Sequence, residues 1–432
     1  MEKIIFHVDV NSAFLSWEAV YRLKHLHAKL DLRTIPSAVG GSQELRHGIV
    51  MAKSIPCKPY KIQTGESLME ARQKCPNLVV VPPNYNLYKS SSNALMEIMR
   101  SYTPDVEQYS IDEAFMDMTG TKSLWGEPVT AANRLREEIH NNLGFTVNIG
   151  VSNNKLLAKM ASDFMKPNMV HTLFPDEIKE KMWKLPIGDL FYVGRATKRR
   201  LENIGITTIG QLANSDVEMI KSHLKNIHGQ TVWNYANGID FSEIKTIHED
   251  NRGYGNSTTI PYDVDSLESA SMVLLSLAET VGMRLRKDNA KISVIAVGIK
   301  YNDFSYVSQQ VTLKEATNIT QEIHANAVKV FAKRWDYCTP IRHLGIHTSK
   351  AVLNKEYRQL SLFDVASAQT NNGNLLGYEK LERIDSMVDS IRQTYGIDSI
   401  KRARFVESKI SHATGGISRD KDTVDYERVE VI

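Results

Sequence analysis

Short apolar runs that end at a polar or charged side chain recur along the N-terminal part of the chain. Lys3–Val10 is rich in β-branched residues and predicts a strand, and Asn11 and Ser12 after it are favoured helix N-caps. Further helices are predicted at residues 13–20, 67–74, 88–102, 130–143 and 154–164, and further strands at 78–81, 106–111, 114–118 and 145–151. This order favours an antiparallel sheet with helices packed on one face, as in ferredoxin-like domains.

Two stretches interrupt or follow this pattern without strong periodicity. Residues 21–75 are polar and rich in Gly and Pro, so they predict an irregular insert, whose lysines Lys53, Lys58 and Lys61 are by themselves typical of a solvated face. Residues 172–241 predict short helices, with a tight turn at Tyr192-Val193-Gly194 that leads into a basic helix start. Such a turn suits a DNA phosphate backbone, and a solvated basic helix pair is an equally good alternative.

The C-terminal half predicts a second α+β domain and a tail. Residues 242–255 predict a polar linker, and residues 256–350 alternate strand and helix patterns. In the tail, a helix is expected at 381–395, and the chain from about Ser408 is expected to be disordered. Gln359-Leu360-Ser361-Leu362-Phe363 precedes a low-complexity run, so these apolar side chains predict either docking into a groove on another protein or a short strand of the second domain.

Composition narrows the class of protein but not its function. Hydrophobic residues make up 42% and charged residues 24% of the 432 residues, which is typical of soluble globular proteins. The spacing of Cys57, Cys75 and Cys338 fits neither a disulfide framework nor a zinc site, which indicates a reducing cytoplasm. We expect no membrane span and no signal peptide. The net charge of +3 permits a nucleic-acid partner without requiring one.

The most distinctive chemistry lies between the two strands of the predicted hairpin. Asp112 and Glu113 occupy a predicted two-residue turn that lacks the Gly such turns favour. Asp9 ends the first strand, and Ser152 is expected to cap the helix that carries Lys155 and Lys159. Carboxylates at a strand end beside a helix N-terminus can hold a divalent cation and phosphate oxygens. A solvated acidic turn and an ordinary strand-to-helix turn are the alternatives.

Three motifs together resemble the Y-family of translesion DNA polymerases, of the bacterial polymerase IV and polymerase V type. They are Asp9-Val10-Asn11-Ser12-Ala13-Phe14, Tyr109-Ser110-Ile111-Asp112-Glu113-Ala114, and Gly150–Lys155 followed by Ala158-Lys159 and Lys166-Pro167. The resemblance covers roughly residues 3–350 and the Gln359 peptide, and it implies a template-directed, low-fidelity DNA polymerase.

The resemblance also implies an α+β multidomain architecture. It would comprise a ferredoxin-like palm (1–20 and 76–171), small fingers (21–75), a helical thumb with a helix-hairpin-helix (172–241), the linker (242–255) and an α+β little finger (256–350). Residues 351–432 would be a tail whose segment 359–363 binds the bacterial β sliding clamp. The protein would be a cytoplasmic monomer that acts on primer–template DNA and dNTPs.

Site residues follow from the same resemblance. Asp9, Asp112 and Glu113, with the Val10 carbonyl, would hold two Mg²⁺ ions, whereas Asp117 is not expected to be a ligand. Nucleotide binding is implied for Ala13, Phe14, Lys58 and Lys166, with Phe14 as the steric gate against a ribose 2′-hydroxyl. DNA binding is implied for Gly194, Arg195 and Lys198, and clamp binding for Gln359, Leu360, Leu362 and Phe363.

Several residues depart from the family pattern. Ile55 and Lys58 stand where many members have a Tyr-x-x-Arg pair, and lysine keeps the charge but lacks the bidentate guanidinium. Asn11 replaces a frequent Asp, and Tyr192 stands where a Gly is usual, so the chain leans towards the polymerase V branch. The rival functions are a partner-dependent or non-catalytic DNA- and clamp-binding subunit, and another two-metal enzyme such as a nucleotide cyclase.

Overall fold

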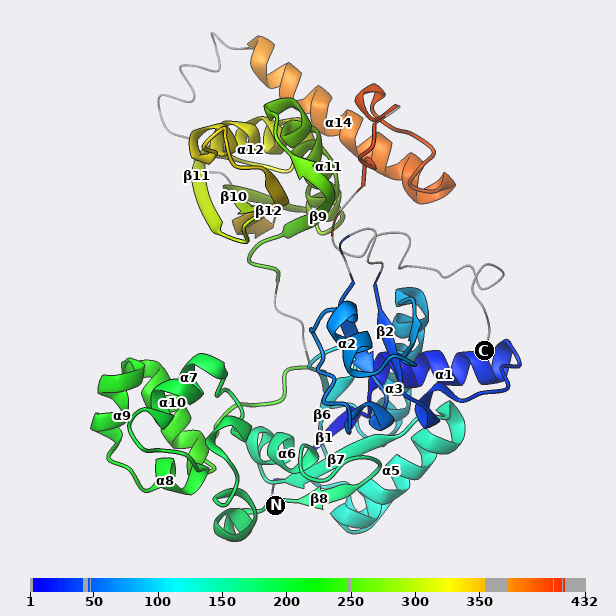
Figure 1. Cartoon of the computed structure of the whole chain (residues 1–432), viewed down its shortest axis with the longest axis vertical. Helices are drawn as coiled ribbons and strands as arrows, with labels where there is room; N and C mark the ends of the chain where they lie inside the picture. Colours follow the sequence, from blue (N-terminus) through cyan, green and yellow to red (C-terminus); the bar gives the residue numbers. More distant parts are fainter. Residues whose placement is uncertain are drawn as a thin grey trace. The chain divides into compact units, whose positions relative to one another are not determined.

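The structure is a computed structural model, and it describes residues 3–41, 46, 48–246, 250–353, 372–406, 408–413 and 415, with side chains left out at 372–379. The chain forms two compact units whose boundary lies near residue 248, inside the predicted linker (Figure 1). The first unit contains the predicted palm, fingers and thumb, and the second contains the predicted little finger and the helix of the tail.

A five-stranded sheet forms the palm. Its strands lie in the order β5-β6-β1-β7-β8, and β1 is central and fully buried because both faces of the sheet are covered. The strand bounds are β1 Ile5–Val10, β5 Val106–Gln108, β6 Glu113–Asp117, β7 Val147–Ser152 and β8 Val170–Thr172. β1 pairs with β6 and β7 in antiparallel fashion, whereas β7 and β8 are parallel.

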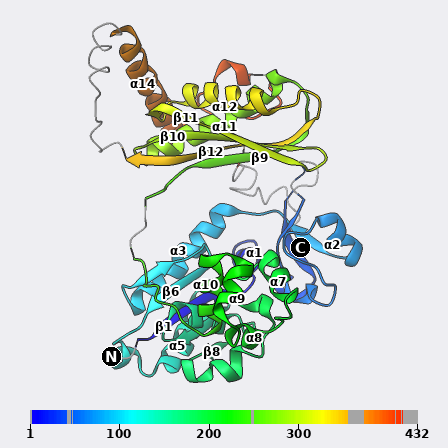
Figure 2. The same ribbon diagram turned by 90° about the vertical axis from the view of Figure 1, so that its left-hand side faces the viewer.

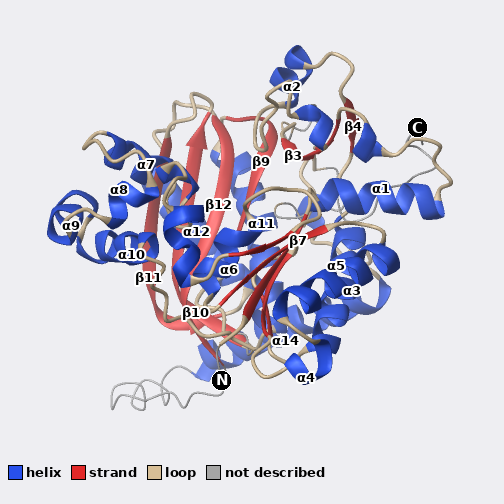
Figure 3. Ribbon diagram, turned by 90° about the horizontal axis from the view of Figure 1, so that it is seen from below, coloured by secondary structure: helices blue, strands red, loops and turns tan. Residues whose placement is uncertain are grey.

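Helices cover both faces of this sheet. Alternate residues of β1, including Phe6 and Val8, join the main core, in which α1, α3 and α5 take part. Ile5 packs instead against Ala158 of α6, and Figure 3 shows α6 on the opposite side of the sheet from α3 and α5. The bounds are α1 Ala13–His25, α3 Tyr85–Tyr102, α4 Lys122–Trp125, α5 Pro128–Leu143 and α6 Lys155–Ser162. The predicted single helical face and wholly antiparallel sheet are therefore wrong in detail.

The insert expected to be irregular is a small folded layer. Its three-stranded sheet has the order β3-β2-β4 and a core of its own, formed by residues such as Val50, Cys57 and Leu68. The bounds are β2 Ser37–Gly40, β3 Val50–Lys53, β4 Val79–Val81 and α2 Leu68–Lys74, with short 3-10 turns at Leu32–Thr34 and Ile55–Cys57. β4, predicted as part of the palm, pairs in parallel with β2. The strand predicted at 78–81 is present as β4, but β2 and β3 were not predicted, because four-residue strands carry too few residues for a clear alternation.

The thumb consists of short helices around an apolar core to which the palm helix α6 also contributes. Its α-helices are α7 Arg195–Glu202, α8 Ile209–Ala213, α9 Val217–Leu224 and α10 Asn226–Ala236. Short turns of other helical types precede them at Pro175–Glu177, Ile178–Met182 and Ile187–Asp189.

The second unit is a four-stranded antiparallel sheet with two helices on one face, as Figure 2 shows. Its elements are β9 Gly255–Val264, α11 Leu267–Lys287, β10 Ala290–Tyr301, β11 Tyr306–Thr317, α12 Thr320–Arg334 and β12 Ile341–Leu353. This agrees with the α+β domain predicted for residues 256–350.

The tail packs on this second unit through charged as well as apolar side chains. Helix α14 (Asn372–Tyr395) is longer than predicted, and Arg392 of α14 lies 2.6 Å from Glu279 of α11. A 3-10 turn at Ala403–Phe405 follows. Ile410 and His412 are buried, so the expected disorder from Ser408 is wrong for these residues. The proposed clamp-binding residues Gln359, Leu360, Leu362 and Phe363 lie outside the described part of the chain.

Candidate active site

Asp9 and Glu113 lie opposite each other on neighbouring strands. Asp9 is near the end of β1 and Glu113 is the first residue of β6, and the register pairs their Cα positions directly. The predicted two-residue turn is thus wrong, because the connection runs from Tyr109 to Asp112 and Glu113 belongs to the strand. Like charges directly opposite each other on a sheet repel, so this pair needs a nearby cation.

The turn residue Asp112 is fastened to the end of β1. The Val10 amide donates to the Asp112 carbonyl over 3.1 Å, and the Ser110 hydroxyl donates to Asp112 Oδ1 over 2.7 Å. Both Val10 and the Asp112 carboxylate line a pocket. The fold therefore brings the two acidic motifs, distant in sequence, to one end of the palm sheet.

Two lysines neutralise the carboxylate pair. Lys159 Nζ lies 2.5 Å from Glu113 Oε1, and the Lys166 ammonium contacts the carboxylate of Asp9 and lies 2.8 Å from Asp163 Oδ1. Burial raises the pKa of Glu113 and the charge of Asp9 adds to the rise, against the opposing effect of Lys159. For both lysines burial works against the charged form, but the surrounding carboxylates outweigh it and raise the pKa.

The buried histidine His7 lies next to the carboxylates and adds no positive charge to the site. His7, two residues before Asp9 on the same face of β1, is fully buried and contacts the Ser162 hydroxyl through Nδ1 at 2.7 Å. Burial lowers the pKa of His7 well below its usual value, and the charge of Lys159 lowers it further. The positive charge near the site therefore comes from the lysines and not from this imidazole.

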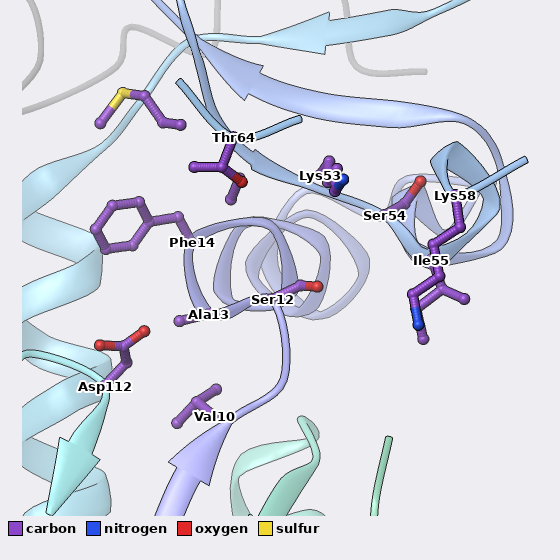
Figure 4. Close-up of a pocket in the computed structure, with 12 residues that line it drawn as sticks. Val10, Ser12, Ala13, Phe14, Lys53, Ser54, Ile55, Lys58, Thr64 and Asp112 are labelled. Atoms are coloured by element: carbon purple, nitrogen blue, oxygen red, sulfur yellow. The ribbon is translucent and has the colours of Figure 1, made fainter. Parts of the chain in front are cut away.

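A pocket of about 250 Å³ opens beside these residues, between the palm and the small layer of the insert (Figure 4). Its lining comprises Val10, Ser12, Ala13, Phe14, Met51, Ala52, Lys53, Ser54, Ile55, Lys58, Thr64 and Asp112. Phe14 stacks on Tyr88 with ring centroids 4.5 Å apart and an interplanar angle of 6°. The ring is thus held in one orientation at the wall of the pocket.

Two lysine side chains and the start of helix α1 line other parts of the same pocket. Lys58 and Lys53 both reach the pocket from the insert, and Lys53 also donates to the Ile62 carbonyl. Ser12 precedes α1 in a left-handed conformation, φ 49°, and its side chain caps no amide among the described residues. A helix N-terminus without a side-chain cap binds anions through its amides and its dipole.

Sequence reasoning missed some of these residues for identifiable reasons. Lys53 belonged to a lysine group that resembled a solvated face, and only the folding of the insert turns it inward. Tyr88 stood at the start of a predicted helix with no signal that it meets Phe14. A weak signal existed for Lys159, which lies one helical turn after Lys155.

The Ser152–Lys155 junction serves a different purpose from the one predicted. Asn154, and not Ser152, is the N-cap of α6 and accepts from the Leu157 amide, while the Ser152 hydroxyl donates to the Leu173 carbonyl. Lys155 Nζ lies 2.7 Å from Glu107, and the same carboxylate accepts the Lys245 amide at 2.7 Å. This junction therefore fastens the start of the linker to the palm.

The predicted DNA-binding residues lie in the thumb and do not line the pocket. Gly194 is the N-cap of α7, and Arg195 and Lys198 in the first turn are exposed. A Cβ built on Gly194 meets no described atom within 4 Å, so the turn is open to the surface.

The donor types at the pocket suit a hard divalent cation, because Asp9, Asp112, Glu113 and the Val10 carbonyl all offer oxygen. The described residues contain no group of three or more His, Cys, Asp or Glu side chains already arranged around a metal position. The lysine contacts account for this, since ammonium groups stand beside Asp9 and Glu113. Within the described residues, no helix combines the length and apolarity that a membrane crossing needs.

Comparisons with known proteins show the family to which the chain is similar. The model of the impB/mucB/samB family matches residues 8–163, the C-terminal domain of the same family matches residues 251–362, and its HHH motif matches residues 175–206. A DNA polymerase IV of Clostridium acetobutylicum is 44% identical over 95% of this chain and 100% of its own length. DNA polymerase IV 1 of Bacillus subtilis is 33% identical over 99% of this chain and 98% of its own.

The solved structures give the same fold. A chimeric Y-family DNA polymerase superposes with a TM-score of 0.69 and 20% identity, covering 81% of this chain and all of its own. The relatives reported above carry the polymerase IV name, so the leaning towards the polymerase V branch finds no support in them.

Proposed function

The chain belongs to the impB/mucB/samB family and is a DNA-directed DNA polymerase of the Y-family, and we propose that Asp9, Asp112 and Glu113 form its catalytic centre. The reaction is template-directed transfer of a nucleotide from a dNTP to a primer, with the low fidelity of translesion synthesis. The single observation that carries the assignment is the register that sets Asp9 directly opposite Glu113 beside the pocket.

We propose that Asp9, Asp112, Glu113 and the Val10 carbonyl hold two Mg²⁺ ions. When bound, such ions supply charge that activates the primer 3′-hydroxyl and neutralises the leaving pyrophosphate. The chain's own part is to hold the three carboxylates close together at one end of the palm sheet. Lys159 and Lys166 support this by offsetting the repulsion between Asp9 and Glu113.

Different residues of the pocket suit the triphosphate and the sugar of a dNTP. The uncapped start of α1 and the side chains of Lys58 and Lys53 offer amide and ammonium donors for the triphosphate. Lys166, which stands beside Asp9, is a further triphosphate donor in this proposal. Phe14 offers a flat apolar wall held by Tyr88, which leaves no partner for a ribose 2′-hydroxyl.

DNA and partner contacts complete the proposal. Gly194, Arg195 and Lys198 hold the phosphate backbone of the primer–template duplex, and Gln359, Leu360, Leu362 and Phe363 dock the enzyme on the β sliding clamp. The protein acts as a cytoplasmic monomer apart from that partner. The palm, fingers, thumb and little-finger boundaries predicted above remain the proposed domain limits, with β4 moved from the palm to the fingers.

Extension of a primed template by the purified protein with dNTPs and Mg²⁺ tests this function. We expect extension without added proteins. The rival proposal, a partner-dependent or non-catalytic subunit, is favoured if extension appears only when further proteins are added. The presence of all three carboxylates supports the catalytic version.

A further inference from the structure

Tyr192 stands in the hairpin turn before α7 with a backbone conformation that its side chain disfavours. Its φ is +75°, the left-handed region that a bulky residue adopts only when its surroundings impose it. The flanking residues supply that constraint. Leu190 and Val193 are both buried in the thumb core, and the Val193 amide donates to the Leu190 carbonyl over 3.0 Å.

The constraint turns a tyrosine side chain outward. Tyr192 is 59% exposed, although its ring centroid lies only 5.4 Å from that of His228 and 6.1 Å from that of Tyr235. His228 is itself tied to α7, because its Nε2 lies 3.1 Å from the Thr197 hydroxyl. The aromatic contacts therefore orient the exposed ring along one face of α10, whose His228 is tied to α7.

Basic and exposed residues follow Tyr192 along the chain, at the start of α7. Gly194, Arg195 and Lys198 follow within two turns and are exposed, and the space at Gly194 is open. A tyrosine there combines a flat apolar face with a hydroxyl donor. Tyrosine hydroxyls are among the groups that bind DNA phosphates.

We propose that Tyr192 is a DNA-contacting residue, whose hydroxyl donates to a backbone phosphate and whose ring packs on the adjoining deoxyribose of the duplex. The inference rests on the proposed function of the thumb and adds a side-chain contact at the turn before α7. A glycine would satisfy the backbone there without strain, so the strained tyrosine points to a role for the side chain itself.

Binding of a fluorescently labelled primer–template duplex to the full-length protein, followed by anisotropy over a series of salt concentrations, tests the inference. We expect Tyr192→Gly to raise the Kd about threefold or more, with Tyr192→Phe also weakened but less, since a hydrogen bond to a charged phosphate is lost in both. The melting temperature of Tyr192→Gly should be unchanged or higher, because the left-handed strain is relieved.

The salt dependence separates a direct contact from a distorted turn. Tyr192 carries no charge, so its loss should leave the slope of log K against log salt unchanged, whereas displacement of Arg195 or Lys198 would reduce it by about 0.9 per lost phosphate contact. Tyr337→Gly is the matched control, because Tyr337 is 55% exposed with φ +61° in the other unit. We expect that variant to bind as the wild type does.

The other possible results decide whether the role of Tyr192 or the proposed function itself fails. Wild-type affinity in Tyr192→Gly, or an affinity loss accompanied by a reduced salt slope or a lower melting temperature, overturns the role of Tyr192. If the wild-type protein neither binds the duplex nor extends a primer, the proposed function itself fails. Extension by the wild type together with unchanged Tyr192→Gly affinity refutes this inference alone.

Discussion

Asp9 and Glu113 are directly paired residues of two antiparallel strands, and each contacts a lysine of its own, Lys166 and Lys159 respectively. The arrangement concentrates negative charge at one end of the palm sheet and compensates it with a lysine of α6 and a lysine of the segment after α6. The site is therefore suited to exchange ammonium contacts for a bound divalent cation.

Replacing Asp112 should remove activity without unfolding the protein. Asp112→Asn keeps the size of the side chain and the Ser110 contact geometry but removes the charge. Loss of metal-based charge stabilisation, several kcal/mol, corresponds to a fall in kcat of about a thousandfold or more. Single-turnover primer extension measures this, and circular dichroism checks the fold.

Asp117→Asn is the control, because Asp117 accepts the Thr119 amide at 2.9 Å and does not line the pocket. Comparable activity in the two variants would refute the role of Asp112.

Shortening Phe14 should weaken discrimination between sugars. Phe14→Ala removes the ring that stacks on Tyr88. The removal leaves space for a ribose 2′-hydroxyl, which would otherwise collide with that ring. We expect the efficiency ratio of rNTP to dNTP incorporation to rise roughly tenfold or more. Phe304→Ala, at a 60% exposed phenylalanine of the second unit, controls for general effects. An unchanged ratio in Phe14→Ala would exclude it as the gate.

The contribution of Lys58 should show in substrate binding. Removing one partly solvated ammonium in Lys58→Ala is expected to raise the KM for dNTP about three- to tenfold with a smaller effect on kcat. Lys58→Arg should retain most of the affinity, because the charge stays. Lys61→Ala, an exposed lysine of the same segment that does not line the pocket, is the matched control. Equal KM values for the Lys58→Ala and Lys61→Ala variants would contradict the prediction.

The buried contact between α11 and the tail should make stability depend on pH. Burial by itself would raise the pKa of Glu279, but hydrogen bonds and charge from Arg392 and Arg402 outweigh it and lower the pKa. A carboxylate whose pKa is lower in the folded state stabilises the fold above its unfolded value of about 4.5, and this contribution disappears as the pH falls through the folded pKa.

Thermal unfolding at several pH values checks this. Glu279→Gln is expected to lose about 3–5 kcal/mol at neutral pH, the usual loss when one partner of a buried ion pair is removed, and to lose less at acid pH. Asp398→Asn breaks the exposed pair with Lys401 and should change stability by less than about 1 kcal/mol. A flat pH dependence of the difference between wild type and Glu279→Gln would contradict the assignment.

Deleting residues 359–363 should separate clamp binding from chemistry. The proposed clamp residues lie apart in sequence from every residue of the pocket, so distributive extension of a primer should stay at the wild-type rate. Binding to the immobilised β sliding clamp should fall about tenfold or more, because loss of large apolar anchors dominates peptide-docking interfaces. A deletion of equal length at 366–370 serves as control.

Local patterns along the chain were sufficient to predict the residue types of the site and the order of most elements. Asp9 at a strand end, the Asp112-Glu113 pair and the lysines after β7 carry local signals, because strand and helix periodicity and turn chemistry act over a few neighbouring residues. The second α+β domain followed in the same way from its long strands and helices. These features need no knowledge of distant contacts.

Which of these residues contact one another depends on how the chain folds in three dimensions. The register of β1 against β6 sets Asp9 opposite Glu113, and a shift by one residue would send the Glu113 side chain to the other face of the sheet. Lys53 turns inward because the short strands of the insert close on a core of their own. Ile410 is buried because it joins the apolar core of the second unit, to which α11 and α12 contribute. Such pairings depend on packing between segments far apart in sequence, where local periodicity carries no information.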